Sequence, residues 1–250
     1  MTETKIIYKW EREMAGETVI ITGGAQRLGL YNAERLAEEG YRAVVTYRRK
    51  RDTLKYLEEK GIGAIQAGFS TEKGIDDFIN AVLKTHSSPR AVIHNASLWF
   101  PDNLILEGKE RFSDLVNVHM LAPFKINYAF KPLPDSSPSA MKDIIHMTDF
   151  TVFKGSGYHA AYSGTKAALE NMTLSFSAMS GPGIQINNIA PALVKFNAWD
   201  DEEYRKAAAK KSIMGFEPGE AVACQAVSYL MNSPYVTGTC LHLDGGRHLV

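Results

Sequence analysis

A glycine-rich turn between an apolar strand and a helix constrains the fold of this chain most strongly. Residues 18–22 form a short β-branched run typical of a buried strand, and residues 30–39 have the pattern of a helix that ends before Gly40. Between them, Gly23 and Gly29 let the backbone turn tightly and approach a pyrophosphate, whose charge is favoured at a helix N-terminus. A tight turn without a ligand is the alternative interpretation.

Strand and helix patterns alternate along the rest of the chain. We expect further strands at 43–47, 63–67, 91–94, 143–148, 185–189 and 238–243, and helices at 75–84, 112–128, 162–180 and 221–231. Such alternation gives a parallel sheet with right-handed crossovers. The predicted fold class is therefore α/β, a Rossmann-type doubly wound parallel sheet of about seven strands with helices on both faces.

Length and composition fit one such unit. The 250 residues, 45% of them hydrophobic, suffice to bury the core of one domain. We expect an N-terminal extension at residues 1–17 and a single nucleotide-binding domain at 18–250. Two stretches break the alternation: 131–139, whose Pro and Ser predict a surface loop, and 195–218, whose length favours a substrate lid as much as a plain connection.

Charge and apolar patterning exclude several classes of partner. The 28 basic and 28 acidic residues balance, so neither nucleic acid nor a membrane surface is expected as a partner. No apolar run is long enough to span a bilayer, and the charged first residues lack the core of a signal peptide, which predicts a cytoplasmic location. Cys224 and Cys240 lack the spacing of metal ligands or of a disulfide framework. We expect both to be reduced, buried side chains, and we expect no metal site.

Four consecutive cations, residues 48–51, follow the second predicted strand. An acidic residue at this strand end would bind the free ribose hydroxyls of NAD, and none is present. Arg48 or Arg49 could instead hold a 2′-phosphate through a bidentate contact, which favours NADPH as the cofactor. A solvated charge cluster at the start of the next helix is the alternative.

Tyr162 and Lys166 lie four residues apart in a predicted helix, behind a strand that ends near Asp149. Residues at this spacing share one helix face, so Lys166 can lie beneath Tyr162, favour the phenolate and lower the phenol pKa. A tuned phenol is a useful proton donor. The pattern by itself also fits an ordinary surface helix.

Five motifs occur in the order typical of one family. They are Thr22-Gly23-x3-Arg27-x-Gly29, Asn95-Ala96-Ser97, Tyr162-x3-Lys166, Ile189-Ala-Pro191, and Val236-Thr-Gly238 with Asp244-Gly-Gly246. From Val19 onward the chain thus resembles the short-chain dehydrogenase/reductase family. Within it, three features resemble the pteridine reductase group: Arg27 replaces a glycine, Asp149 stands where most members carry Ser, and Asn-Ala-Ser-x-aromatic replaces Asn-Ala-Gly.

The resemblance implies roles for individual residues. It makes Tyr162, Lys166 and Asp149 the catalytic residues. It places the cofactor against Gly23, Gln26, Arg27, Leu28, Tyr47, Arg48, Arg49, Phe69, Ser70, Asn95, Ala96, Ser97, Thr148, Tyr162, Lys166, Pro191 and Leu193. It assigns the substrate to Arg27, Ser97, Trp99, Asp149 and Tyr162, with Trp99 as the ring that stacks on a pterin. From the residues alone, Trp99 fits a half-buried core aromatic equally well, and Asp149 fits a cap of the turn that follows its strand.

The implied activity is NADPH-dependent reduction of a 7,8-dihydropterin, with dihydromonapterin as the expected substrate and weak reduction of dihydrofolate. A general carbonyl or 3-oxoacyl reductase is the first alternative, although it would carry Ser at position 149. A non-catalytic NADP-binding regulator is the second, against which the Tyr162 and Lys166 pair argues. Family members assemble as homotetramers through the tyrosine helix, so a homotetramer is expected.

Two positions depart from the family pattern. His119 stands where most members carry an Asn that supports a proton relay; its ring could bridge to water, or it could be a satisfied histidine inside a helix. Gly68 stands where an Asp commonly contacts the adenine amino group. Either cofactor affinity is lower as a result, or Ser70 compensates.

Overall fold

The computed structural model describes residues 16–86, 88–130 and 141–250. The expected surface loop at 131–139 and most of the N-terminal extension lie outside these ranges. Among the helices of the described part, none combines the length and apolar character needed to cross a membrane.

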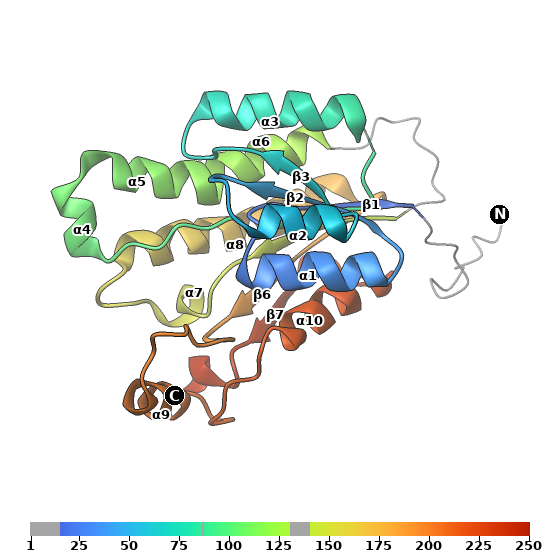
Figure 1. Cartoon of the computed structure of the whole chain (residues 1–250). Coiled ribbons are helices and arrows are strands. Elements are labelled where there is room, and N and C mark those ends of the chain that lie inside the picture. The colour runs from blue at the N-terminus through green and yellow to red at the C-terminus, as the bar shows by residue number, and fades with distance from the viewer. Residues whose placement is uncertain (1–15, 87, 131–140) are drawn as a thin grey trace.

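The centre of the fold is a seven-stranded sheet with the strand order β3-β2-β1-β4-β5-β6-β7, in which every neighbouring pair is parallel (Figure 1). The strands are β1 (Thr18–Ile21), β2 (Arg42–Tyr47), β3 (Gly63–Gln66), β4 (Ala91–His94), β5 (Lys142–Met147), β6 (Ile184–Pro191) and β7 (Cys240–Leu243). This arrangement confirms the predicted doubly wound α/β fold.

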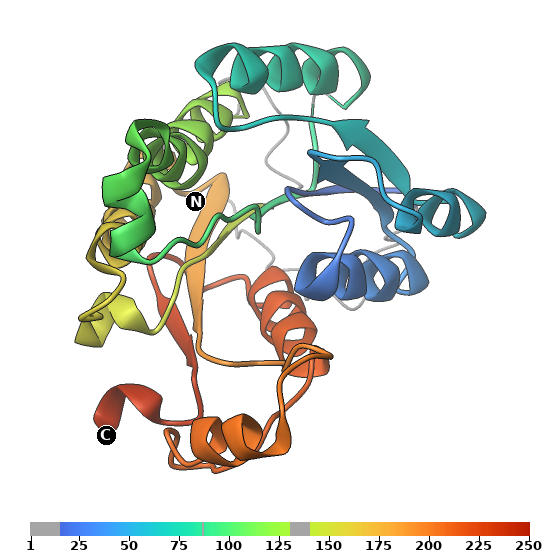
Figure 2. The ribbon, with the colours of Figure 1, turned by 60° about the vertical axis from the view of Figure 1, so that its left-hand side comes forward.

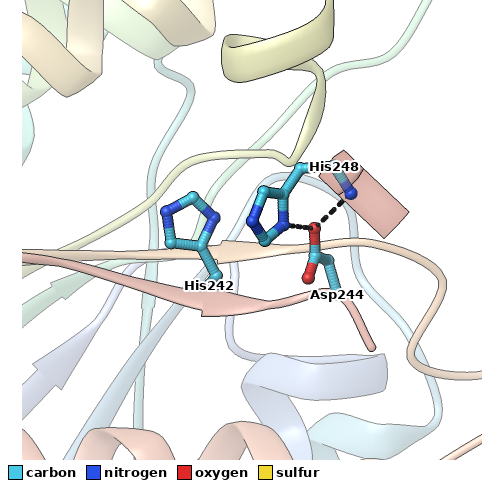
Figure 3. Close-up of side chains that lie close together, drawn as sticks. All are labelled: His242, Asp244 and His248. Atoms are coloured by element: carbon cyan, nitrogen blue, oxygen red, sulfur yellow. Dashed lines mark hydrogen bonds and ion pairs between the residues drawn. The ribbon is translucent and has the colours of Figure 1, made fainter. Parts of the chain in front are cut away.

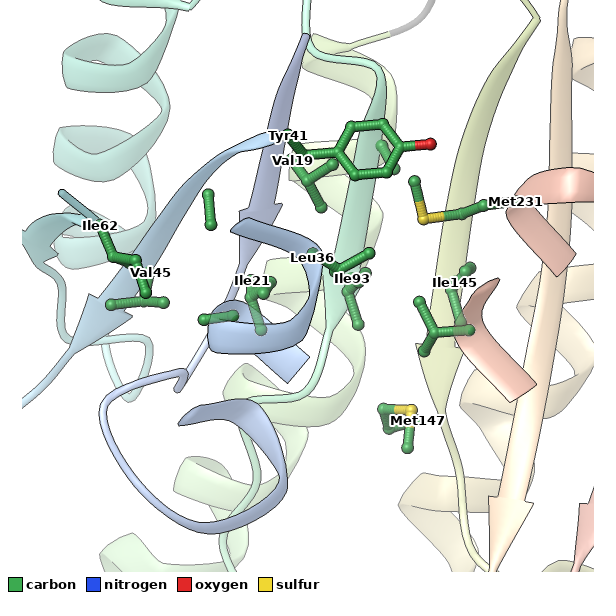
Figure 4. Packing of buried hydrophobic residues seen from close by; sticks show 14 of the residues in the cluster. Val19, Ile21, Leu36, Tyr41, Val45, Ile62, Ile93, Ile145, Met147 and Met231 are labelled. Carbon is green, nitrogen blue, oxygen red and sulfur yellow. The ribbon is translucent and has the colours of Figure 1, made fainter. Parts of the chain in front are cut away.

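Helices cover both faces of the sheet (Figure 2). They are α1 (Arg27–Glu38), α2 (Thr53–Glu59), α3 (Glu72–Thr85), α4 (Asp102–Glu107), α5 (Lys109–Val116), α6 (Ala122–Ala129), α7 (Thr151–Lys154), α8 (Ala160–Ser180), α9 (Glu202–Ala209) and α10 (Ala221–Asn232). Alternate side chains of β1 enter different cores, as a strand's period of two requires. Val19 and Ile21 pack with α1, α2 and α10 (Figure 4), whereas Ile20 packs with α3 and α6.

The predicted helix at 112–128 is not one α-helix. It consists of α5, a π-helical segment (Asn117–Leu121) and α6, with Pro123 in the first turn of α6. Proline has no amide hydrogen, and its ring clashes with the carbonyl one turn earlier, so the wider π turn accommodates it. Helices α2, α4, α7 and α9 were not predicted, because they are too short to show a clear apolar period.

Both cysteines are free thiols; Cys224 is buried as expected, whereas Cys240 is only partly buried. Burial is the main cause of a raised pKa for both thiols, and the pKa of Cys240 rises to about 12. Neither thiol is therefore activated as a nucleophile.

A chain of buried polar side chains ties the sheet to α6 and α8. His94 Nε2 lies 2.8 Å from Asn127 Oδ1, and Asn127 Nδ2 donates to His146 Nε2 at 3.1 Å. His146 Nδ1 lies 2.8 Å from the hydroxyl of Thr173, which donates to the Leu169 carbonyl. All four polar side chains are buried. Because an unpaired buried polar group is costly, this chain holds α8 in one register on β5.

The two buried histidines predict that acid destabilises the fold. Burial lowers the pKa of His94 to about 4 and that of His146 well below its ordinary value, whereas both groups titrate near 6.5 in the unfolded chain. As pH falls below about 6.5, the unfolded state binds protons that the folded state does not bind. The protonation of His94 alone should lower the free energy of unfolding by on the order of 3 kcal/mol at pH 4.

Urea unfolding of the wild type and of His94→Gln between pH 7.5 and 5 measures this effect. The loss of unfolding free energy on acidification should be smaller in His94→Gln by about 1 kcal/mol per pH unit below 6.5. Equal pH slopes for the two proteins would contradict the prediction.

Candidate active site

The turn between β1 and α1 is packed against the loop that follows β4. Gly23 has a left-handed φ of 65°, and an added Cβ there would lie 2.8 Å from the Ala96 Cα. A Cβ on Gly29 would lie 2.5 Å from Asn95 Nδ2, which donates to the carbonyls of Thr22 and Gly23. Close packing therefore requires glycine at both positions, and Asn95 holds the turn against the loop after β4.

A cavity of about 360 Å³ opens beside this turn. It is lined by most of the predicted cofactor residues, namely Gly23, Gln26, Arg27, Leu28, Tyr47, Arg48, Arg49, Phe69, Ser70, Asn95, Ala96 and Ser97. Arg51, Thr46 and Val118 also line it and were not predicted. The hydroxyl of Thr46 accepts the Gly23 N–H at 2.8 Å, a role in shaping the turn that the strand pattern could not reveal.

The other predicted cofactor residues lie away from the lining of this cavity. Thr148, Tyr162, Lys166 and Pro191 are among them, while Leu193 lines a separate cavity of about 150 Å³. Thr148 Oγ1 donates to Asn188 Oδ1 at 3.0 Å, and Asn188 belongs to β6.

The charges of the cavity beside the glycine turn fit a phosphorylated dinucleotide. Among the described residues that line it, none is acidic, whereas Arg27, Arg48, Arg49 and Arg51 contribute four guanidinium groups. Gly23 and Gly29 of the turn belong to the lining, so a ligand could approach the main chain closely. Ser70 lines the cavity, whereas Gly68, which departs from the family pattern, does not.

Arg27 connects the glycine turn to the segment at 195–218. Its φ of 51° is unusual for a residue with a side chain, so the position is strained. The guanidinium donates to Asn197 Oδ1 and to the Lys195 carbonyl, the latter at 3.3 Å. The side chain thus lines the cavity and also bridges to the segment predicted as a lid.

The structure brings the three predicted catalytic residues together. Tyr162 Oη donates to Asp149 Oδ2 at 3.0 Å, and Lys166 Nζ donates to the Met147 carbonyl at 2.7 Å. Lys166 Nζ lies 5.9 Å from the centroid of the Tyr162 ring. The other Asp149 oxygen accepts the Thr151 N–H at 2.9 Å, so the carboxylate also caps its turn, as the alternative interpretation proposed.

The predicted direction of the Tyr162 pKa is wrong. Burial, followed by the charge of Asp149 and its hydrogen bond, raises the phenol pKa well above 10. Lys166 is fully buried, which lowers its pKa to about 8 against the opposing effect of Asp149. Its ammonium faces a backbone carbonyl and does not pair with the phenol oxygen. Tyr162 therefore remains protonated at neutral pH.

His119 has a partner at each ring nitrogen. Its Nε2 accepts the Leu98 N–H at 3.2 Å and faces the Ser97 hydroxyl at 2.9 Å, so Nδ1 carries the proton and donates to Thr165 Oγ1 at 2.8 Å. The Thr165 hydroxyl in turn donates to the Tyr162 carbonyl. Burial lowers the pKa of His119 well below 6.5. Of the two interpretations of His119, these contacts match a neutral histidine whose ring nitrogens both have hydrogen-bond partners.

Trp99 is exposed over 59% of its surface, so the interpretation as a half-buried core residue is wrong. One part of its ring lies against His159, with centroids 4.4 Å apart and an interplanar angle of 32°. The sequence analysis did not single out His159, although it lies three residues before Tyr162. Its Nδ1 is 3.1 Å from the Ser156 hydroxyl.

Comparison with known proteins identifies the class. A family model described as enoyl-(acyl carrier protein) reductase matches residues 23–248. The chain therefore belongs to the short-chain dehydrogenase/reductase family and is an oxidoreductase, and the family implies a nicotinamide cofactor.

Three curated relatives are dihydromonapterin reductases, from Shigella boydii serotype 4 (strain Sb227), Escherichia coli O6:K15:H31 (strain 536 / UPEC) and Shigella flexneri. Each is 40% identical to this chain over 231 residues, which cover 92% of this chain and 96% of the relative. The resemblance found in the sequence motifs is confirmed.

The contact between Asp149 and Tyr162 predicts a measurable change in the phenol. Asp149→Asn removes the negative charge that raises the Tyr162 pKa, so that pKa should fall. Ultraviolet difference titration, with Tyr162→Phe subtracted in each background, isolates this one tyrosine. Asp77→Asn, on the exposed side of α3, should leave the midpoint unchanged. A midpoint that stays or rises in Asp149→Asn would contradict the assignment.

Proposed function

We propose that this chain is an NADPH-dependent dihydropterin reductase that converts dihydromonapterin to tetrahydromonapterin and reduces dihydrofolate weakly. The observation that carries the proposal is the Asp149 carboxylate bonded to Tyr162. A carbonyl reductase would stabilise a developing alkoxide with a neutral hydroxyl, whereas a pterin presents an edge of N–H donors that a carboxylate can accept. The names of the relatives support the same substrate.

The reaction adds hydride to C6 of the dihydropterin and a proton to N5. The bound nicotinamide would supply the hydride. Tyr162 is our candidate for the proton donor, since its raised pKa keeps the phenol protonated, and Asp149 orients that phenol through the 3.0 Å hydrogen bond. Lys166 would hold the nicotinamide ribose through its ammonium group, whose pKa is about 8.

Trp99 and Ser97 would form the wall against which the pterin stacks. The exposed indole has one side against His159, which limits its rotation and leaves area for an aromatic ligand. The Ser97 hydroxyl lies beside His119 Nε2 and can exchange this contact for a bond to the pterin.

Residues 195–218 would act as the substrate lid. The two ends of the segment are joined at a narrow neck, where the Gly219 N–H donates to the Val194 carbonyl and Lys195 pairs with Glu220. The interior reaches the glycine turn through Arg27 and Asn197. The interior is also held to the C-terminal turn, where the Met214 N–H donates to the Gly245 carbonyl at 3.1 Å, so movement of the lid would break this contact and leave the sheet intact.

We also expect a cytoplasmic homotetramer with no nucleic-acid or membrane partner. The supporting observation is a mostly apolar groove between α4, α5 and α8 that contains Leu106, Phe112 and Met120. Leu106 is 89% exposed, and burying such area favours association. Light scattering on the purified chain measures the assembly.

Cofactor preference tests the arginines. Arg48→Ala should weaken NADPH binding by about 10-fold or more and leave NADH binding almost unchanged, because the lost guanidinium would contact only the 2′-phosphate. Fluorescence titration of each nucleotide measures both constants. Arg35→Ala on the outer face of α1 is the matched control. Equal losses for both nucleotides would show that Arg48 does not read the phosphate.

Turnover tests the substrate. Purified chain should oxidise NADPH with dihydromonapterin, and Tyr162→Phe should lower kcat by about 10²- to 10⁴-fold because the proton donor is lost. Asp149→Ser should lower kcat/KM for the dihydropterin more than it lowers kcat/KM for a simple carbonyl substrate. Activity on 3-oxoacyl or enoyl thioesters without any on dihydropterins would refute the proposal. Binding of NADPH without turnover of any substrate would instead favour the regulator.

A further inference from the structure

Three metal-ligand side chains meet where β7 ends and the C-terminal turn begins. His242, Asp244 and His248 each bring a ligand atom within 4.8 Å of the other two; we call them the C-terminal cluster (Figure 3). His242 and Asp244 are two residues apart around the end of β7, and His248 returns on the short 3-10 helix Arg247–Leu249.

Asp244 is held rigidly at the centre of the cluster. Its Oδ1 accepts the Gly246 N–H at 3.0 Å, and its Oδ2 accepts the His248 N–H at 3.0 Å and His248 Nδ1 at 2.6 Å. Gly245 and Gly246 both have positive φ, which turns the chain back over the carboxylate. The Asp244 side chain is 2% exposed, so two of the three ligands are preorganised.

The donor set selects one class of ion. Two imidazoles and one carboxylate suit borderline transition metals such as Zn²⁺, whereas Ca²⁺ and Mg²⁺ prefer sets of oxygen ligands.

We propose that the C-terminal cluster binds one divalent transition metal ion of the Zn²⁺ class. Ligand atoms around tetrahedral zinc are about 3.4 Å apart, so the 2.6 Å contact between His248 Nδ1 and Asp244 Oδ2 must open by roughly 0.8 Å as the ion takes the place of the shared proton. His242 is exposed and can rotate toward the ion, and one water would complete the coordination. The cysteine spacing predicted no metal site; the cluster forms because the turn folds His248 back onto the strand end.

The cluster lies against the segment that follows the catalytic carboxylate. The His242 ring is 4.3 Å from that of Phe153 in α7, and the Arg247 guanidinium lies 4.5 Å from the centroid of Phe150, the residue after Asp149. A bound ion would therefore stiffen the C-terminal turn beneath α7. The site itself does not depend on which substrate the enzyme reduces.

The same contacts also fit a simpler role of the cluster that needs no metal. The Asp244 and His248 pair could serve only to fasten the turn, with His242 stacked on Phe153 and on His248, whose ring centroid is 4.2 Å away. His242 separates the two interpretations, because its removal leaves the Asp244 and His248 pair intact.

Titration of the untagged full chain with Co²⁺ tests the proposal. The wild type should bind one Co²⁺ per chain with a visible absorption band of tetrahedral type, and Zn²⁺ should displace it. Affinity should fall at least about 10-fold in His242→Ala and in His248→Ala, because each variant loses one of the three ligands. His86→Ala, outside the cluster, should bind like the wild type.

Thermal unfolding provides a second measurement. Zn²⁺ in excess should raise the Tm of the wild type and not that of His242→Ala, since only a ligand of the folded state stabilises it. No Co²⁺ band in the wild type, or equal affinity in the wild type and His242→Ala, would overturn the metal site and leave the fastened turn.

Discussion

Parallel pairing of the central strands is the constraint on which the site depends. Because β1, β4 and β5 run in the same direction, their carboxyl ends meet at one edge of the sheet, which places the Gly23 turn, Asn95 and Asp149 together. The amide of Asn95 then closes the glycine turn, and Gly29 has no space for a side chain. The glycine turn and Asn95 thus come together because of the strand topology, and the small residues make this close packing sterically possible.

The position of α8 on β5 is the second requirement, because this helix carries Tyr162 and Lys166. The polar chain through Asn127 and His146 is fully buried, so a shift of the helix would leave several donors and acceptors without partners. Nearer the site, Lys166 bonds to the Met147 carbonyl. The protein therefore holds Tyr162 and Lys166 in place through polar groups that are buried away from water.

The same burial sets the chemistry of the site. Placing a phenol, an ammonium and an imidazole out of water keeps Tyr162 protonated, brings the pKa of Lys166 to about 8 and keeps His119 neutral. The phenol of Tyr162 thus stays protonated beside the Asp149 carboxylate, while Arg27, in a strained backbone conformation, links the glycine turn to Asn197 in the segment 195–218.

Local patterns in the sequence determined the α/β alternation and the glycine turn and singled out Tyr162, Lys166 and Asp149, which the fold brings together, because apolar periods and short motifs report local geometry. They could not reveal the π turn before Pro123, the bond from Thr46 to Gly23 or the stack of His159 on Trp99, which join distant segments or depend on packing. The Tyr162 pKa shows the difference most clearly. Helical spacing predicted that Lys166 would lower it, and burial beside Asp149 raises it, because desolvation is a property of the folded interior alone.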